Sequence, residues 1–219
     1  MKSIRLGALL GACLLLCACN PLMRASWDTL RASVQGPAPL ELTPAQVAAT
    51  PYYQIKVRAP GGEAVMALVR QRGDRQFWVA STRQVLVTRD GLVVRSEGFE
   101  PDLAATRFDG DSPFKIGLHR LADNAEATRW LDFKPGYLVG VAAHSRFRRH
   151  GLEQVEILGQ THELLRIDEH LQAPGVGLDA VNRYWVDPQD GFIMQSLQQV
   201  TPDLQLAITQ LHPYRGDAP

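Results

Sequence analysis

The side chains best suited to chemistry are gathered in one short stretch of the chain. It supplies carboxylates and imidazoles, the groups used most often for acid–base catalysis and metal binding: His162, Glu163, Asp168, Glu169 and His170. If the stretch is a strand, alternation places His162, Asp168 and His170 on one face, where Arg166 would pair with a carboxylate. The sequence has no HExxH or GxSxG motif and no Cys–His pair, and charged residues facing water are the competing interpretation.

A second candidate is the basic stretch from His144 to Gly151. It contains three arginines that could meet acidic sugars, lipid phosphates or a protein partner: Arg146, Arg148 and Arg149. On a strand, Arg146 and Arg148 share one face with the two flanking histidines, and Arg149 lies on the other face. These arginines are the expected ligand or partner surface, and a solvated strand end is the alternative.

Two short motifs have a simpler structural explanation. Arg72-Gly73-Asp74 spells an adhesion tripeptide, but it falls where a hairpin must turn. Asp109-Gly110-Asp111 lies in a Gly/Pro-containing loop and lacks the further ligands of a calcium-binding loop. Neither motif is expected to carry function, and no metal site is predicted.

Four tryptophans are the natural sugar-stacking candidates: Trp27, Trp78, Trp130 and Trp185. Trp78 and Trp185 lie among alternating apolar neighbours, so we expect both indoles in the core with their nitrogens hydrogen-bonded. Trp185 is the residue that the fold is expected to need most.

These residues must be positioned by strands, because apolar residues recur with period two from Tyr52 onward. Asp90-Gly91 between two apolar runs is a strong hairpin signal. About ten antiparallel strands with local connections are predicted, with 162–171 interpreted as a strand rather than a helix. The expected fold is mainly β, an antiparallel meander curled into a half-barrel or barrel.

One or two short helices are predicted before the strands. Residues 23–34 place apolar side chains at spacings of four, three and four, which indicates one face of an amphipathic helix. A second helix is expected from Pro44, with Thr43 as its N-cap and an end before Pro51.

The three cysteines lie within the first nineteen residues and indicate targeting. Lys2 and Arg5 precede an apolar run of signal-peptide length, and Leu16-Cys17-Ala18-Cys19 matches the lipobox of bacterial lipoproteins. We predict lipid on Cys19, with Cys13 as the alternative. The expected organisation is a signal peptide at 1–18, an anchor, short helix and linker at 19–40, and a single β-rich domain at 41–219.

Composition and charge exclude several classes of protein. The chain has 23 basic and 23 acidic residues and no long basic run, which argues against nucleic-acid binding. No cofactor is expected apart from the covalent lipid on Cys19, through which the protein would bind a membrane. Asn20 follows that cysteine, where Asp is the common inner-membrane retention signal, so we expect the outer membrane, on its periplasmic side.

Several stretches together resemble the group 4 capsule polysaccharide lipoprotein family (GfcB/YjbF). They are the lipoprotein signal, "TPYYQIKVRAPGGEAVMALVRQRGDRQFWVASTRQVLVTRDGLVVRSEGF" and "RYWVDPQDGFIMQSLQQ". The resemblance implies an outer-membrane lipoprotein used in export or assembly of capsule or exopolysaccharide. It brings no catalytic residue, and we take the matching Trp78, Trp185, Asp187 and Gly191 as structural.

Three functions follow as hypotheses. The first is a noncatalytic accessory or scaffold that holds a polysaccharide or an export protein. The second is a periplasmic polysaccharide-modifying enzyme with acids from Glu163, Asp168 or Glu169, and the third is a lipid or lipoprotein carrier. The barrel interior discriminates between them, since converging carboxylates favour the enzyme, an open apolar trough the carrier, and a filled core the scaffold.

Overall fold

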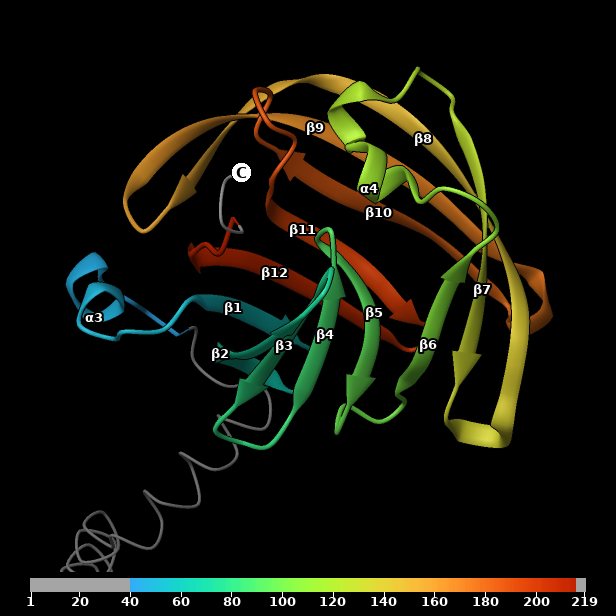
Figure 1. Cartoon of the computed structure of the whole chain (residues 1–219), viewed down its shortest axis with the longest axis horizontal. Helices are drawn as coiled ribbons and strands as arrows, with labels where there is room; N and C mark the ends of the chain where they lie inside the picture. Colours follow the sequence, from blue (N-terminus) through green and yellow to red (C-terminus); the bar gives the residue numbers. More distant parts are fainter. Residues whose placement is uncertain (1–39, 216–219) are drawn as a thin grey trace, which may run out of the picture. The chain divides into compact units, whose positions relative to one another are not determined.

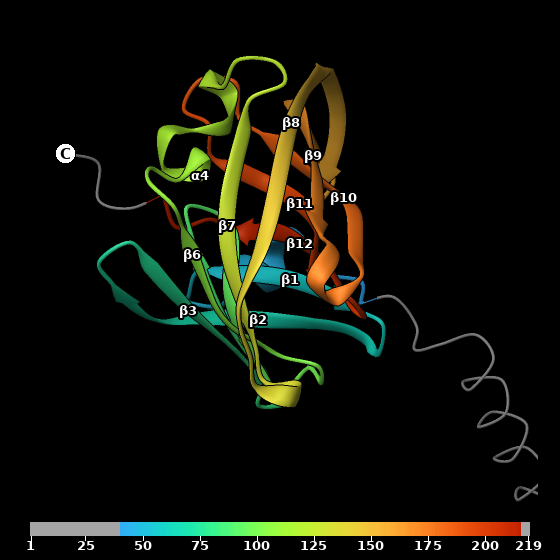
Figure 2. The ribbon, with the colours of Figure 1, turned by 90° about the vertical axis from the view of Figure 1, so that its right-hand side faces the viewer.

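The computed structural model describes residues 40–215, and these residues form one large antiparallel sheet with short helical segments at its ends (Figures 1 and 2). The helical segments are α3 (Pro44–Ala48), α4 (Pro113–Ile116), η2 (Leu118–Arg120), η3 (Pro135–Tyr137) and η4 (Pro174–Val176). The strands are β1 (Gln54–Ala59), β2 (Gly62–Arg72), β3 (Arg75–Ala80), β4 (Val85–Arg89), β5 (Leu92–Glu97), β6 (Leu103–Phe108), β7 (Glu126–Phe133), β8 (Leu138–Ile157), β9 (Gln160–Ala173), β10 (Leu178–Val186), β11 (Ile193–Thr201) and β12 (Leu204–His212).

The sheet is a meander that coils into a nearly closed barrel. Its order is β5-β4-β3-β2-β1-β12-β11-β10-β9-β8-β7-β6, so the first and last strands pair and every other neighbour is consecutive along the chain. The two edge strands, β5 and β6, meet through side chains. Ser96 Oγ donates to Asp102 Oδ1 at 2.8 Å and accepts from Leu103 N at 3.0 Å. The predicted fold class is confirmed.

Most of the predicted elements are present, and the differences have local causes. α3 begins at Pro44, and Thr43 and Gln46 form a reciprocal capping box. Residues 160–173 are a strand, as predicted. The described residues form twelve strands rather than about ten, partly because β6, "LAATRF", alternates too weakly to be recognised. The segment α4–η2 was also not predicted, and the helix predicted at 23–34 lies outside the described residues.

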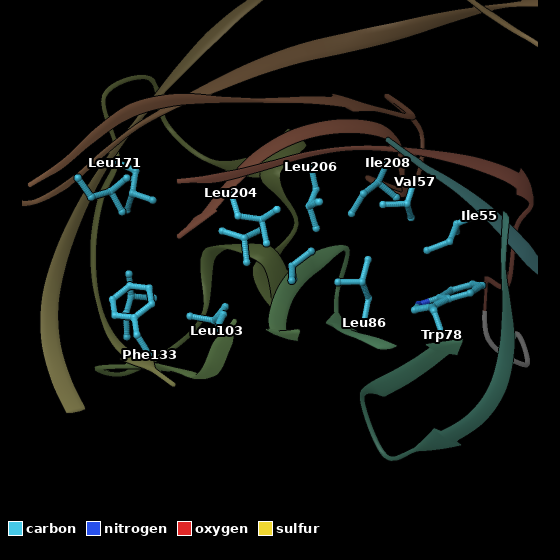
Figure 3. Close-up of a cluster of buried hydrophobic side chains, with 14 of the residues drawn as sticks. Ile55, Val57, Trp78, Leu86, Leu103, Phe133, Leu171, Leu204, Leu206 and Ile208 are labelled. Atoms are coloured by element: carbon cyan, nitrogen blue, oxygen red, sulfur yellow. The ribbon is translucent and has the colours of Figure 1, made fainter. Parts of the chain in front are cut away.

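The barrel interior is filled by two apolar clusters separated by a polar layer. One cluster includes Trp78, Leu103 and Leu206, which Figure 3 shows among the side chains pointing toward one another from several strands. The other includes Phe114 of α4 and the inward-facing Phe147 of β8. The alternation of strands β8, β9 and β10 places Ser145, Glu169 and Asn182 between these clusters.

The β4–β5 hairpin contributes to this filling because both of its faces are covered. Leu86 and Val93 belong to the first apolar cluster, and Val87 and Leu92 belong to the second. The buried amide of Gln198 in β11 accepts from Val93 N at 3.0 Å and donates to Gly91 O at 2.9 Å. One backbone N–H of the edge strand β5, and one carbonyl of the turn before it, are therefore satisfied from across the barrel.

Candidate functional site

The most highly coordinated polar group in the described structure is the carboxylate of Glu169, on the inner face of β9. It is fully buried, and Arg129 of β7, also buried, donates to Oε1 at 2.7 Å. Three neighbours complete its coordination: Ser145 Oγ at 2.5 Å, Asn182 Nδ2 at 2.8 Å and Tyr184 Oη at 2.9 Å. We call these five residues the buried carboxylate cluster.

Strand register brings the cluster together. Glu169 lies opposite Asn182 of β10. On its other side it pairs with Phe147 of β8, and Ser145 lies two residues along β8 from Phe147 on the same inner face. Arg129 pairs with Ala143 of β8, so its guanidinium reaches Glu169 across one intervening strand. The five residues of the cluster come from four consecutive strands, β7 to β10, and the meander order makes them neighbours.

The buried carboxylate cluster is built for stability rather than for acid–base chemistry on a substrate. Burial and the adjacent Glu169 carboxylate raise the pKa of Tyr184, so its hydroxyl stays protonated and donates. The adjoining void measures only about 10 Å³. A buried charge with one salt bridge and three further donors is well compensated, and a substrate has no route to it.

The three acids proposed for catalysis do not come together. Glu169 is inside the barrel, and Asp168 is on the outer face, where Arg166 binds both of its oxygens at 2.8 Å. Glu163 is exposed near the tip of the β8–β9 hairpin, within reach only of Gln154 at 3.4 Å. The predicted pairing of Arg166 with a carboxylate is confirmed, whereas a converging catalytic set of these acids is contradicted.

The predicted basic surface lies on the outer face of β8, β9 and β10. Arg146 and Arg148 line a hollow of about 330 Å³ with His150, Asp168 and His170. We call this hollow the outer groove. Most of its charges are already paired, because Arg146 binds Glu126 at 2.8 Å and His150 lies 3.2 Å from Asp168.

Arg149 is separated from the other two arginines, as the alternation predicted. Its backbone N–H donates to Asp123 Oδ1 at 3.1 Å, and its guanidinium donates to the carbonyl of His119. Arg149 therefore connects β8 to the segment between β6 and β7 that contains α4 and η2. Arg148 has no ion pair within residues 40–215.

A second polar hollow, which the sequence did not indicate, lies at one end of the barrel. We call it the mouth hollow. It measures about 440 Å³, and loops distant in the chain line it: the β2–β3 and β4–β5 turns, α4–η2, the β10–β11 loop and the segment after β12. Its charged lining residues are Asp74, Asp90, Lys115, Arg120, Asp190 and Arg215.

The charges of the mouth hollow are of both signs and partly exposed. Arg215 binds Asp190 and lies 3.2 Å from Asp187 Oδ2, which fixes the segment after β12 over the β10–β11 loop. Burial and the nearby Asp74 raise the pKa of the Asp90 carboxyl, against the smaller opposing effects of Arg89 and Lys115. Asp74 contacts only Arg89, at 3.7 Å, among the described residues.

The tryptophans divide between the two faces of the sheet. Trp78 is buried, and its Nε1 donates to Thr88 Oγ1 at 2.9 Å, as predicted. The prediction that Trp185 lies in the core is wrong for the barrel interior, because Tyr184 and Val186 occupy the inner face. Trp185 lies on the outer face, where it is partly buried against an apolar cluster of Ile157, Leu164 and Met194. Its Nε1 donates to Glu153 Oε2 at 2.7 Å, and this bond lowers the pKa of Glu153.

An apolar hollow of about 540 Å³ lies beneath the tip of the β8–β9 hairpin. Val47 of α3, Ile157, Leu164, Met194 and Leu211 contribute to its lining. It is open to solvent and outside the filled barrel interior. A carrier whose cavity is the inside of the barrel is therefore contradicted by the packing of the core.

The remaining sequence motifs have structural roles or lie outside the described residues. Gly73 has a φ of 59° in the β2–β3 turn, as the hairpin interpretation of Arg72-Gly73-Asp74 requires. No cluster of three metal-binding side chains occurs in residues 40–215, and no helix there is long and apolar enough to cross a bilayer. Cys19, the predicted lipidation site, precedes the described part.

Comparisons with known proteins agree with this architecture. The model of the family "Group 4 capsule polysaccharide lipoprotein gfcB, YjbF" matches residues 27–211. The uncharacterized lipoprotein YjbF of Escherichia coli K12 is 27% identical over 199 residues, which cover 90% of this chain and 92% of that protein. The uncharacterized lipoprotein GfcB of the same strain is 23% identical over 191 residues, covering 85% and 88%.

A solved structure supports the fold alone. The crystal structure of the hypothetical lipoprotein YmcC from E. coli K12 superposes with a TM-score of 0.71 at 22% identity. The match covers 85% of this chain and 95% of that one. The nearly closed antiparallel barrel is therefore shared with that lipoprotein.

Proposed function

This chain belongs to the group 4 capsule polysaccharide lipoprotein family, and from that premise we propose a noncatalytic accessory role in capsule or exopolysaccharide export or assembly. In this proposal the protein is held by lipid on Cys19 at the periplasmic side of the outer membrane. Its β-domain then engages the polysaccharide or a protein of the export machinery. The family's name supplies the polysaccharide context.

The proposal that the protein is noncatalytic is supported by the positions of the three acidic residues that the sequence offered for catalysis. Glu169 is saturated by four partners inside the barrel, Asp168 is held by Arg166, and Glu163 lies alone on a hairpin. Hydrolysis of a glycosidic bond by the usual mechanism needs two carboxyl groups flanking one bond. These three acids are separated by the sheet itself or by their existing partners.

The experiment is complementation of a deletion strain. Deletion should reduce surface polysaccharide, and a variant with Glu163→Gln and Asp168→Asn should restore it, since neither of these two acids has a chemical role in this proposal. Abundance is measured in parallel by immunoblotting. Loss of export at wild-type abundance would return the enzyme hypothesis, and undiminished export in the deletion strain would reject the accessory role.

The anchor is tested separately. Cys19→Ala should abolish labelling by radioactive palmitate and release the protein from outer-membrane fractions, because the acyl acceptor is missing. Cys13→Ala is the matched control and should label normally. Loss of label in Cys13→Ala, with normal label in Cys19→Ala, would assign the anchor to the upstream cysteine.

A further inference from the structure

The mouth hollow has the position and size of a ligand site. Ligand pockets usually measure about 300–1,000 Å³ and recur at the mouths of β-barrels. This one measures about 440 Å³, and residues from five separate segments of the chain line it. Figure 1 shows α4, the tip of the β4–β5 hairpin and the β10–β11 loop on the same side of the sheet.

The lining offers hydrogen-bond donors and acceptors in equal measure. The carboxylates of Asp74 and Asp90 can accept hydrogen bonds, and Lys115 and Arg120 can donate them. Lys115 makes no ion pair or side-chain hydrogen bond within residues 40–215. Its ammonium group is therefore available to a ligand.

The six charged residues are three acids and three bases, so the hollow has no net formal charge. A polyanion such as nucleic acid, or a lipid phosphate, is bound by an excess of basic groups. Sugar hydroxyls each donate one hydrogen bond and accept up to two, which is the pattern this lining complements. The half-exposed Ile116 adds apolar surface for the C–H face of a sugar ring.

The floor of the hollow is fixed before any ligand arrives. The β10–β11 loop is closed by Gly191 N to Asp187 O at 2.8 Å and by Phe192 N to Asp190 Oδ1 at 2.8 Å. The Arg215 guanidinium packs over the Phe192 ring, 4.6 Å from its centroid. Preorganised polar groups lower the entropic cost of binding.

We propose that the mouth hollow binds a short neutral segment of the polysaccharide, with Asp74 and Lys115 as hydrogen-bonding residues. This inference rests on the proposed function and adds to it the ligand and the site. The outer groove is the weaker alternative. Arg148 has no ion pair there among the described residues, but Arg146 and His150 are engaged by Glu126 and Asp168.

The test compares two charge-neutral double variants of the full-length protein purified in detergent. Asp74→Ala with Lys115→Ala removes one acid and one base from the mouth hollow. Glu126→Ala with Arg146→Ala removes an ion pair from the outer groove. The probe is exopolysaccharide purified from the producing organism, immobilised on a gel, and the readout is protein affinity for that gel.

The mouth variant should bind at least tenfold more weakly, with an unchanged melting temperature, and the outer-groove variant should bind like the wild type. Equal binding by all three proteins, or loss only in the outer-groove variant, overturns the inference. No binding by the wild type overturns it too, whereas the accessory role fails only if the deletion strain exports normally. Export is therefore also measured in the deletion strain and in strains that produce each double variant.

Discussion

The buried carboxylate cluster and the mouth hollow contain almost the same kinds of side chain and differ in their access to solvent. Glu169 has every oxygen engaged and no exposed surface. Asp74, in contrast, is half exposed and has one distant partner. Residue type alone would select the buried carboxylate cluster as the functional site. Accessibility to solvent and unsatisfied hydrogen-bonding capacity instead favour the mouth hollow as a ligand site.

This difference explains how a barrel can contain a charged centre that is closed to substrates. The polar layer at Glu169 joins β7, β8, β9 and β10 and separates two apolar clusters. Its geometry depends on strand register, which a buried ion pair can help to specify. The mouth is built from loops, whose residues can change without disturbing the sheet.

The largest effect is expected from Glu169→Gln. The substitution leaves Arg129 as a buried charge without its counter-charge, which costs about 3–5 kcal/mol of unfolding free energy. Chemical denaturation should show this loss, and Glu163→Gln on the same strand should stay within about 0.5 kcal/mol of the wild type. Equal, small effects would mean that the cluster is not sealed.

Trp78 and Trp185 test the contrast between the barrel interior and its outer face. Trp78→Ala should cost about 3–5 kcal/mol, because a large buried side chain is replaced by a cavity. Trp185→Ala should cost about 1.5 kcal/mol, chiefly from its hydrogen bond to the Glu153 carboxylate. Thermal unfolding of both variants measures the order, and the reverse order would refute the outward placement of Trp185.

Gly191 of the mouth hollow lies close to the imidazole of His119, and a side chain at this position would collide with that ring. It has a φ of 78°, and a Cβ there would overlap the ring of His119. Gly191→Ala should cost about 1–2 kcal/mol from the backbone conformation, with a further loss from the clash. Adding His119→Ala should recover only the clash component, and recovery of nothing would show that the contact is absent.

The smallest effect is expected at Asp90, whose carboxyl has a raised pKa. An acid with a raised folded-state pKa binds protons more readily when folded, so its charge costs stability as pH rises above about 3.8. Asp90→Asn removes that cost and keeps a residue that tolerates the φ of 51°.

The variant should therefore be slightly more stable than the wild type at pH 7, by less than about 0.5 kcal/mol, and equal to it near pH 3. Melting temperatures measured across this range give the comparison. A difference that grows toward acid pH would contradict the raised pKa.

The sequence was sufficient for the elements that depend on local patterns. Thr43 forms the expected cap, and Asp90-Gly91 forms the expected turn, because both arise from neighbouring residues. Alternation correctly separated Arg148 from Arg149, but it could not say which face of β10 was inner. Trp185 was assigned to the core for that reason.

The functional geometry depended on pairings that no local pattern contains. Arg129 is forty residues before Glu169, and their contact requires the order of β7, β8 and β9. The mouth hollow is harder still, since Asp74, Lys115 and Asp190 come together only when the barrel closes. A closed meander places alternate turns at one end, which is the one signal that could have grouped them.

The most direct test of this account is amide hydrogen exchange of the full-length protein with and without oligosaccharides from the producing organism's own exopolysaccharide. The account predicts slower exchange in the β2–β3 turn, the α4–η2 segment and the β10–β11 loop, and unchanged exchange in β8, β9 and β10 around Glu169. Protection confined to the outer face of β8, or no protection at any segment, would contradict it.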